Sequence, residues 1–212
     1  MNEVFRPYLR KFVLVFFDDV LVYSKSEKEH LDHLDTMLAT MASAQLHLNV
    51  AKCSFGESRL EYLGHIISAN GIEADPSKIQ AMTAWPLPHN PTTLRGFLGL
   101  TGYYRRFVKD YGKIAAPLTS MLKPENFIWT PASTTAFELL KTAMSSAPVL
   151  KAPDFSKPFT VETDASGSGL GAVLQQERRP IAFFSRALSG RSLAKSAYER
   201  ELMALVLAIQ HW

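Results

Sequence analysis

Apolar runs and amphipathic periodicities alternate along this chain, so the pattern predicts both strands and helices. Two apolar stretches, residues 12–17 and 20–23, are rich in Val, Phe and Leu and are typical of two buried strands joined by a short connection. Residues 27–46 place Leu and Met at three- and four-residue steps with charges opposite, which predicts an amphipathic helix. The other elements predicted in this part are a helix tail at residues 2–10, a strand pair around residues 59–67 and a turn at residues 68–71.

The middle of the chain predicts a series of helices. Asp75 and Pro76 form a helix start, with Asp as the cap and Pro in the first turn, and this helix is expected to end at about Trp85. The elements expected after it are helices at about residues 93–108, 114–122 and 131–144, and a short strand at residues 127–129. Three glycines at positions 96, 99 and 102 each cost about 1 kcal/mol relative to Ala in a helix interior. Their spacing places them on one helix face, where another backbone could approach closely.

Beyond Pro158 the pattern changes to strands. Strands are predicted at residues 159–163, 170–175 and 180–185, with a turn at residues 164–169. Residues 192–212 predict a helix with one apolar side, made of Tyr198, Leu202, Leu205, Ala208, Ile209 and Trp212. Separate runs of helices and strands make the fold class α+β.

Composition narrows the class of protein. With 212 residues, 47% apolar and 20% charged, the chain is long enough for one large or two small globular domains. A net charge of +3 permits nucleic-acid binding without arguing for it. The lone Cys53 excludes an intrachain disulfide framework and cysteine zinc clusters. No apolar run approaches ~20 residues, so no membrane span is expected, and no targeting signal is visible. Both ends fall inside predicted elements, so we expect a piece of a longer protein.

Asp18 and Asp19 interrupt the first apolar stretch. Two neighbouring carboxylates among core-type residues would repel one another, and a hard divalent cation would repay their desolvation. The alternative is a hairpin turn with two solvated aspartates, because Asp tolerates turn geometry. The residues alone leave both interpretations open.

The sequence Phe16-Phe17-Asp18-Asp19 with its apolar flanks resembles the palm hairpin of reverse transcriptases, in particular those of gypsy-class LTR retrotransposons. The family usually opens this motif with Tyr, so the chain keeps the aromatic face and lacks the hydroxyl. The resemblance implies that Asp18 is a metal ligand and Asp19 its supporting partner. It also implies template contacts for Phe16 and Phe17.

The resemblance extends through the rest of the palm. Residues 60–67 look like the hairpin with which these enzymes hold the primer end, which makes Leu63, Gly64 and His65 nucleic-acid contacts. Lys52 lies where the family has a lysine near the incoming triphosphate. From the residues alone, Lys52 is a solvated surface lysine.

Residues 96–106 look like the family's thumb. The pattern implies that Gly99, Tyr103, Tyr104, Arg105 and Arg106 contact nucleic acid, since Arg neutralises phosphate and Tyr packs on sugar or base. The alternative is a helix C-terminus that attracts cations through its dipole, with the aromatic rings in the core.

A second acidic pair resembles the opening of a ribonuclease H domain. By the resemblance, Asp164 after the first strand and Glu201 in the first helix are catalytic metal ligands. Glu199 is the rival to Glu201, but it lies on the opposite side of the helix. An aspartic protease is rejected, because the residues after Asp164 differ from its Asp-Thr-Gly motif and no second copy exists.

The resemblance spans nearly the whole chain. It divides the chain into the C-terminal part of the palm (1–74), a helical thumb (75–125), a connector (126–158) and the N-terminal part of an RNase H-like domain (159–212). It implies RNA-directed DNA polymerisation with associated RNase H, using two Mg²⁺ or Mn²⁺ ions per active site.

The partners implied by the resemblance are an RNA template, a DNA primer, the RNA–DNA hybrid, deoxynucleoside triphosphates and the remainder of the Pol polyprotein, with no membrane. The implied location is intracellular, in a cytoplasmic particle or the nucleus. Because the family shares its metals with acids that this sequence lacks, we expect the 212 residues alone to be inactive. The competing hypothesis is a degenerate retroelement remnant that acts at most as a nucleic-acid-binding module.

Overall fold

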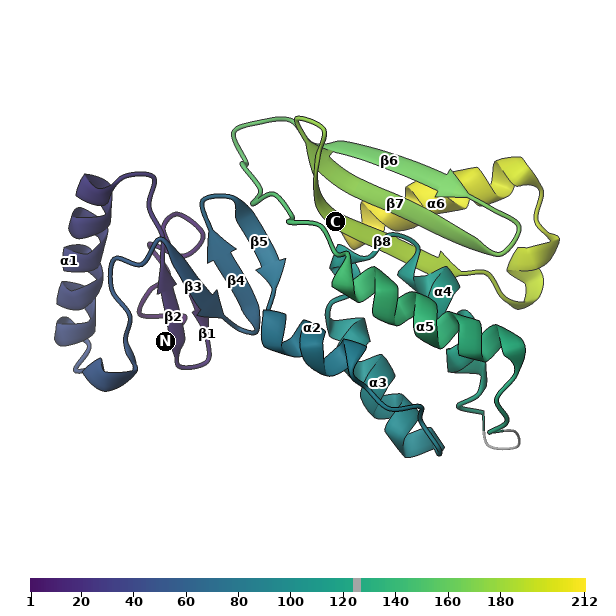
Figure 1. The fold of residues 1–212 in the computed structure, drawn as a ribbon. Coiled ribbons are helices and arrows are strands. Elements are labelled where there is room, and N and C mark those ends of the chain that lie inside the picture. The colour runs from purple at the N-terminus through teal and green to yellow at the C-terminus, as the bar shows by residue number, and fades with distance from the viewer. Residues whose placement is uncertain (124–126) are drawn as a thin grey trace. The chain divides into compact units, whose positions relative to one another are not determined.

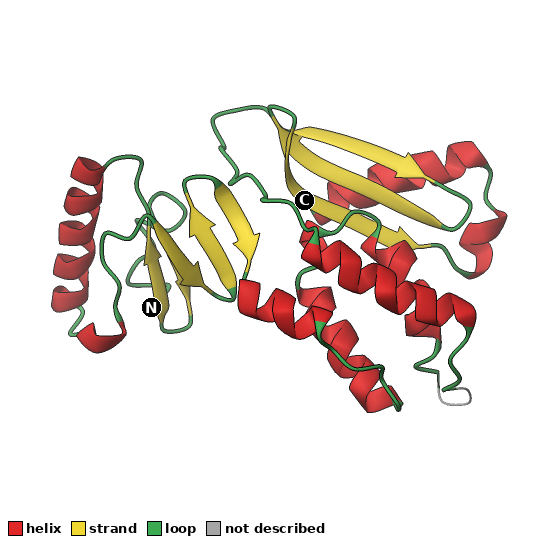
Figure 2. Cartoon of the chain, in the orientation of Figure 1, coloured by secondary structure: helices red, strands yellow, loops and turns green. Residues whose placement is uncertain are grey.

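The computed structural model describes residues 1–123 and 127–212 (Figure 1). The chain divides into two compact units, Met1–Tyr62 and Leu63–Trp212. Helices, strands and connections alternate in both units, which confirms the mixed fold class (Figure 2). The expected border between thumb and connector, at residues 125 and 126, lies outside the described residues. In the described part, no helix is both long and apolar enough to cross a membrane.

The first unit opens with an antiparallel hairpin of β1 (Val13–Phe16) and β2 (Asp19–Val22). Phe16 pairs with Asp19, so the connection is a two-residue turn, and Phe17 adopts a φ of 53° there. This confirms the two predicted strands with the acidic pair at their connection. The helix tail expected at residues 2–10 is wrong, because this segment forms successive turns. Pro7 lacks an N–H group, and Arg10 has a φ of 63°, so neither suits a helix interior.

Helix α1 (Glu27–Ser43) covers the core of the first unit. Ser26 caps it by accepting a hydrogen bond from the Glu29 N–H. Its buried Met37 and Met41 pack with Phe5 and Val13. The helix ends three residues before the predicted boundary. Two further short elements, η1 (Val50–Lys52) and β3 (Arg59–Tyr62), complete this unit.

The second unit begins with the hairpin of β4 (His65–Ser68) and β5 (Gly71–Ala74). Ile72 of β5 exchanges two backbone hydrogen bonds with Leu150, at 2.8 and 2.9 Å. Helix α2 (Pro76–Thr83) follows, and its Asp75 cap accepts a hydrogen bond from the Ser77 N–H at 2.8 Å. The capped helix start that the sequence predicted at Asp75 is confirmed.

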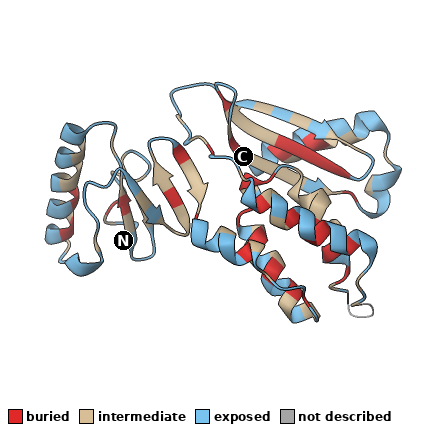
Figure 3. Ribbon diagram, viewed as in Figure 1, coloured by how far each residue is buried: buried red, intermediate tan, exposed pale blue. Residues whose placement is uncertain are grey.

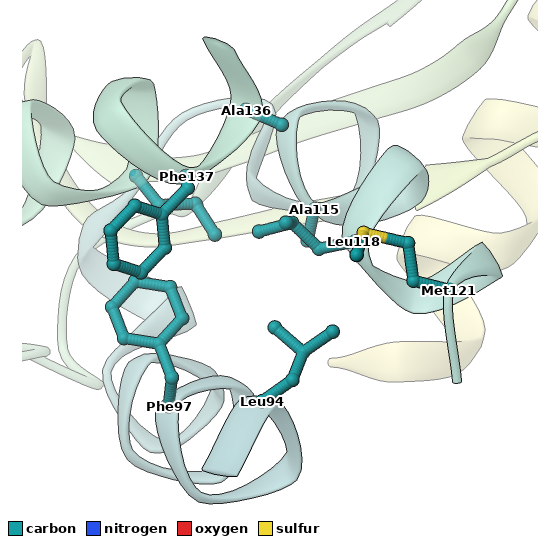
Figure 4. Close-up of a cluster of buried hydrophobic side chains, with 8 residues drawn as sticks. Leu94, Phe97, Ala115, Leu118, Met121, Ala136 and Phe137 are labelled. Carbon is teal, nitrogen blue, oxygen red and sulfur yellow. The ribbon is translucent and has the colours of Figure 1, made fainter. Parts of the chain in front are cut away.

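Three longer helices build the main core of this unit. They are α3 (Pro91–Tyr103), α4 (Tyr111–Ser120) and α5 (Pro131–Ser145). Buried side chains from all three helices form one cluster, in which the ring centroids of Phe97 and Phe137 lie 4.7 Å apart (Figure 4). The single helix expected at residues 93–108 is wrong, because it breaks at Tyr104 and continues as the short 3₁₀ helix η2 (Arg105–Phe107).

The strand expected at residues 127–129 is also wrong, since these residues adopt no regular structure. Phe127 and Trp129 instead pack on the helical core. The Trp129 indole N–H donates to the Pro88 carbonyl at 2.8 Å. Hydrophobic burial, rather than strand pairing, accounts for this aromatic run.

The chain then forms an antiparallel sheet in the order β6 (Thr160–Ala165), β7 (Gly169–Gln176) and β8 (Arg179–Ala187). A 3₁₀ turn, η3 (Gly190–Ala194), leads to α6 (Ala197–His211), which contacts β6 and β7 (Figure 1). These strands and this helix confirm the predicted order of elements.

The apolar side predicted for the last helix is correct at Ala208 and wrong for its larger residues. The residues of α6 that are buried against the sheet are Ala204 and Ala208, with Met203 and Leu207 partly buried. The larger residues expected there stay exposed, Tyr198 at 89% and Leu202 at 62%. Exposed positions recur along the helices of the second unit (Figure 3). Small alanines let the helix backbone lie close to the sheet, which turns the bulky residues outward.

Candidate functional site

The first acidic pair lies at the tip of the β1–β2 hairpin, with both aspartates exposed. Their exposure matches the hairpin-turn interpretation. Because both carboxylates are solvated, no cation is needed to compensate for their burial. The Asp19 carbonyl accepts a weak hydrogen bond from the Tyr62 hydroxyl at 3.5 Å. Burial raises the pKa of that Tyr62 phenol, and the charge of Asp19 raises it further. Beside the acids, Phe16 and Phe17 meet edge to face at 4.9 Å and are 51% and 80% exposed. The tip therefore offers two solvated carboxylates next to two open aromatic rings.

The second predicted contact region is the turn between β3 and β4. Leu63 and Gly64 both adopt positive φ, 51° and 70°. The Tyr103 hydroxyl donates to the Leu63 carbonyl, and the Tyr104 hydroxyl donates to the Gly64 carbonyl, each at 2.7 Å. The structure thus joins two sets of predicted site residues that lie 40 positions apart.

His65 lies beneath this turn, and its Nδ1 is 2.9 Å from the Leu63 carbonyl oxygen. The geometry requires the Nδ1–H tautomer as donor, while Nε2 is buried without a hydrogen-bond partner. Burial lowers the pKa of His65; the hydrogen bond to Leu63 opposes this, and the charge of Arg106 adds to the lowering. Burial thus favours the neutral form of His65 more than in an ordinary solvated histidine.

The residues predicted to form the thumb separate into a buried group and an exposed group. Tyr104 is 1% exposed, so the expectation that it contacts nucleic acid directly is wrong in this structure. Tyr103 is 54% exposed, and a Cβ added at Gly99 would meet nothing within 4 Å. Arg105 is exposed and Arg106 is partly buried. Both arginines line a cavity of about 390 Å³ within the second unit, together with Arg186, His211 and Phe184 among other residues.

Among the described residues, no other backbone lies close to the three glycines, and an approach by a nucleic-acid duplex stays a prediction. A Cβ added at Gly96 would lie 3.4 Å from the Trp85 ring, and one added at Gly102 would lie 3.5 Å from the Tyr111 hydroxyl oxygen. Side chains, rather than a backbone, occupy two of the three positions in this structure.

The second acidic pair is divided between strand and helix. Asp164 pairs with Gly171 on β7, and a Cβ at Gly171 would lie 3.1 Å from Asp110 Oδ1. Directly opposed residues share a face of the sheet, so Asp164 lies on the face near Asp110. There Lys113 Nζ is 3.0 Å from Asp110 Oδ1 and 3.9 Å from Asp164 Oδ2. Sequence reasoning missed these two neighbours, because no local pattern links residues separated by about 50 positions.

Glu201 is exposed on α6. The rival Glu199 has a structural role, since its Oε2 accepts from the Ser196 N–H at 2.8 Å in a capping box. These hydrogen bonds lower the pKa of Glu199, and Lys195 lowers it further. The cap explains Glu199 without a metal and leaves Glu201 as the candidate.

Lys52 closes η1 with an exposed side chain, in agreement with the solvated-lysine interpretation. Within the described residues, no group of three His, Cys, Asp or Glu is arranged to hold a metal ion. Any ion at either acidic pair would need ligands in addition to those the described residues bring together.

Comparison with known sequences gives the family. Residues 1–67 match the family described as reverse transcriptase (RNA-dependent DNA polymerase), and residues 129–212 match the RNase H-like domain found in reverse transcriptase. The chain is 43% identical over 210 residues to the Pol polyprotein from transposon 297 of Drosophila melanogaster. This chain belongs to the reverse-transcriptase family of retrotransposon Pol polyproteins. The gypsy-class resemblance seen in the sequence is thereby confirmed.

Other relatives of this Pol segment agree. It is 39% identical over 222 residues to the gypsy Pol polyprotein of D. melanogaster, and 34% identical over 218 residues to the Tf2-3 polyprotein of Schizosaccharomyces pombe. The chain spans about a fifth of its two fly relatives, 20% and 21% of their lengths, and 16% of the yeast one.

Solved structures show the same fold. A foamy viral protease-reverse transcriptase in complex with RNA/DNA hybrid superposes with a TM-score of 0.89 at 21% identity. The match covers 99% of the Pol segment and 29% of the viral chain. A second structure of that viral protein, in complex with dsDNA, gives a TM-score of 0.86 at 22% identity.

Proposed function

We propose that this segment forms part of an RNA-directed DNA polymerase with associated RNase H, acting on RNA template, DNA primer and deoxynucleoside triphosphates. The observation that carries the proposal is the β1–β2 hairpin, which presents Asp18 and Asp19 at its tip inside the region that matches reverse transcriptases. The foamy viral relatives are seen with RNA/DNA hybrid and with dsDNA, which supports the same class of partner here.

Each acidic pair suits a hard divalent cation, because carboxylate oxygens are the ligands that Mg²⁺ and Mn²⁺ prefer. Two such ions, when bound, would supply charge neutralisation at the reacting phosphate and a more acidic primer 3′-hydroxyl. Asp18 would ligate, and Asp19 would support it from the first position of β2. Phe16 and Phe17 offer apolar faces on which a base or sugar can pack.

The RNase H-like part would use a second site with the same ligand chemistry. Asp164 and Glu201 are its candidate ligands, for hydrolysis of the RNA strand of the hybrid. Arg105 and Arg106 would neutralise backbone phosphates. Since the described residues alone assemble no complete metal site, we infer that the 212-residue polypeptide is inactive by itself.

Primer extension by the Pol protein that carries this segment tests the proposal. In Asp18→Asn and Asp19→Asn, we expect extension to fall by about a hundredfold or more, because a metal contributes several kcal/mol of transition-state stabilisation. The matched control is Asp35→Asn, an exposed acid on α1 of the same unit, which should retain activity. Full extension by the hairpin variants would refute the assignment.

A further inference from the structure

The backbone conformation of the turn at Leu63–Gly64 is not the one that its two residues would favour by themselves. Both residues adopt positive φ, and the left-handed region is unfavourable for Leu. Gly suits the second position, but a hairpin turn of this kind favours Asn or Asp before it. Contacts from elsewhere must therefore hold Leu63 in place.

Four donors converge on the two carbonyls of this turn. The Leu63 oxygen accepts from the Tyr103 hydroxyl at 2.7 Å and from His65 Nδ1 at 2.9 Å. The Gly64 oxygen accepts from the Tyr104 hydroxyl at 2.7 Å and from the Asp75 N–H at 3.2 Å. Consecutive tyrosines at the end of α3 thus bind consecutive carbonyls of the turn.

Shape complementarity adds to the hydrogen bonds. A Cβ at Gly64 would lie 3.0 Å from the Tyr104 hydroxyl oxygen, so the tyrosine fills the space that a side chain would need. The His65 ring lies between 5.4 and 5.7 Å from the rings of Tyr103, Tyr104 and Phe107. The second compact unit begins at Leu63, so the turn and α3 belong to the same unit.

We propose that Tyr103 and Tyr104 are positioning residues that clamp the Leu63–Gly64 turn to the end of α3, so that turn and helix move as one body. The proposal rests on the proposed function and on the resemblance of residues 60–67 to a hairpin that holds the primer end. The two hydroxyls then determine where the primer end is held relative to the thumb helix. Tyr104 is buried in the core and holds the turn from there, whereas Tyr103 is exposed and can also contact a ligand.

Amide hydrogen exchange of the 212-residue chain tests the clamp directly. Tyr103→Phe and Tyr104→Phe remove only the hydroxyls, and Tyr198→Phe, at an 89% exposed site, is the matched control. Exchange in peptides spanning residues 62–67 should rise about threefold to tenfold in each variant, the range for one lost hydrogen bond, with α5 unchanged. Unchanged exchange at the turn, or an equal rise throughout the unit, overturns the clamp.

A double-mutant cycle gives a second measurement. Gly64→Ala should destabilise the chain more in the presence of the Tyr104 hydroxyl than in Tyr104→Phe, because the added methyl group meets that oxygen. We expect the factor by which Gly64→Ala raises the unfolding equilibrium constant to be at least threefold smaller in the Tyr104→Phe variant than in wild type. Strict additivity of the two substitutions contradicts the proposed contact.

Binding separates this proposal from the one on which it rests. Wild type should prefer an RNA–DNA hybrid with a recessed DNA 3′ end over a blunt hybrid, and the double Phe variant should lose that preference. If wild type binds neither hybrid while exchange at the turn rises as expected, the proposed function fails and the clamp stands. If wild type shows the preference and the double variant keeps it, the clamp does not position the primer.

Discussion

The carboxylate of Glu177 forms a small ionic network at the β7–β8 turn. It binds Lys151 and lies 2.6 Å from Lys157 Nζ, so one acid joins the sheet to the segment before it. The hydrogen bonds and charges of both lysines hold the pKa of Glu177 at about 2. Next to it, the buried Gln176 amide donates to the Asp154 and Lys157 carbonyls at 2.8 and 3.1 Å. These contacts anchor the strand-free segment before β6.

A lowered folded-state pKa makes the network sensitive to acid. The carboxylate of Glu177 stabilises the fold above its usual pKa of 4.5, and this contribution is lost as the pH falls through about 2. In Glu177→Gln, the free energy of unfolding should therefore depend less on pH between 4.5 and 2. Urea unfolding at several pH values measures this, with Glu138→Gln on the exposed side of α5 as the control. Identical pH profiles for wild type and Glu177→Gln would show that the network adds nothing.

Single residues also show which structural roles can be predicted from the sequence alone. Asp75 was predictable as a cap, because a cap acts within its own turn. The acidic pair at the β1–β2 turn was predictable for the same reason, since its flanking strands are local. Lys113 beside Asp164 and Tyr104 beneath Gly64 were not, because each contact joins distant segments through tertiary packing.

At the scale of elements, helix and strand order followed from periodicity, but the buried face of α6 did not. Its large apolar residues form the more obvious periodic pattern, but the face of α6 that packs against the sheet is the one with the alanines. Similarly, the pattern over residues 93–108 did not predict the break at Tyr104. Tyr104 binds the β3–β4 turn, which is distant in the sequence, and a local pattern contains no information on that contact. Periodicity thus predicts that a helix or strand exists, whereas the segments that pack against it determine which face is buried and where the element ends.

The contact of α4 with β8 yields a prediction for one glycine. The Gly112 N–H donates to Ser185 Oγ at 2.7 Å, and a Cβ there would lie 2.9 to 3.1 Å from backbone atoms of Ser185 and Arg186. Gly112→Ala should destabilise the second unit by about 1–2 kcal/mol, since overpacking outweighs the gain in helix propensity. Thermal unfolding measures the change.

Gly99 provides a control of opposite sign. It lies inside α3 with nothing within 4 Å of an added Cβ. Gly99→Ala should therefore stabilise the unit by up to about 1 kcal/mol. A stabilising effect of Gly112→Ala as well would show that β8 can move away from α4 without loss.

At the scale of the whole molecule, the family match covers parts of both units, and the candidate metal ligands are divided between the two units. Asp18 and Asp19 belong to the first unit, and Asp164 and Glu201 to the second. Each pair supplies two carboxylates, and a cation held by two exposed acids keeps most of its water. Weak binding of Mg²⁺ by the chain alone is the consequence.

The purified 212-residue chain should therefore give no template-dependent primer extension with either Mg²⁺ or Mn²⁺, and circular dichroism should show that it is folded. The chain should nevertheless bind an RNA–DNA hybrid, and this binding should weaken with salt, because the phosphate contacts proposed for Arg105 and Arg106 need no metal. Extension that Asp18→Asn abolishes would contradict this, since it would mean that the hairpin acids suffice for catalysis. Extension that survives this substitution would instead identify a contaminating polymerase. The hairpin variant thus separates catalysis by the chain from catalysis by an impurity.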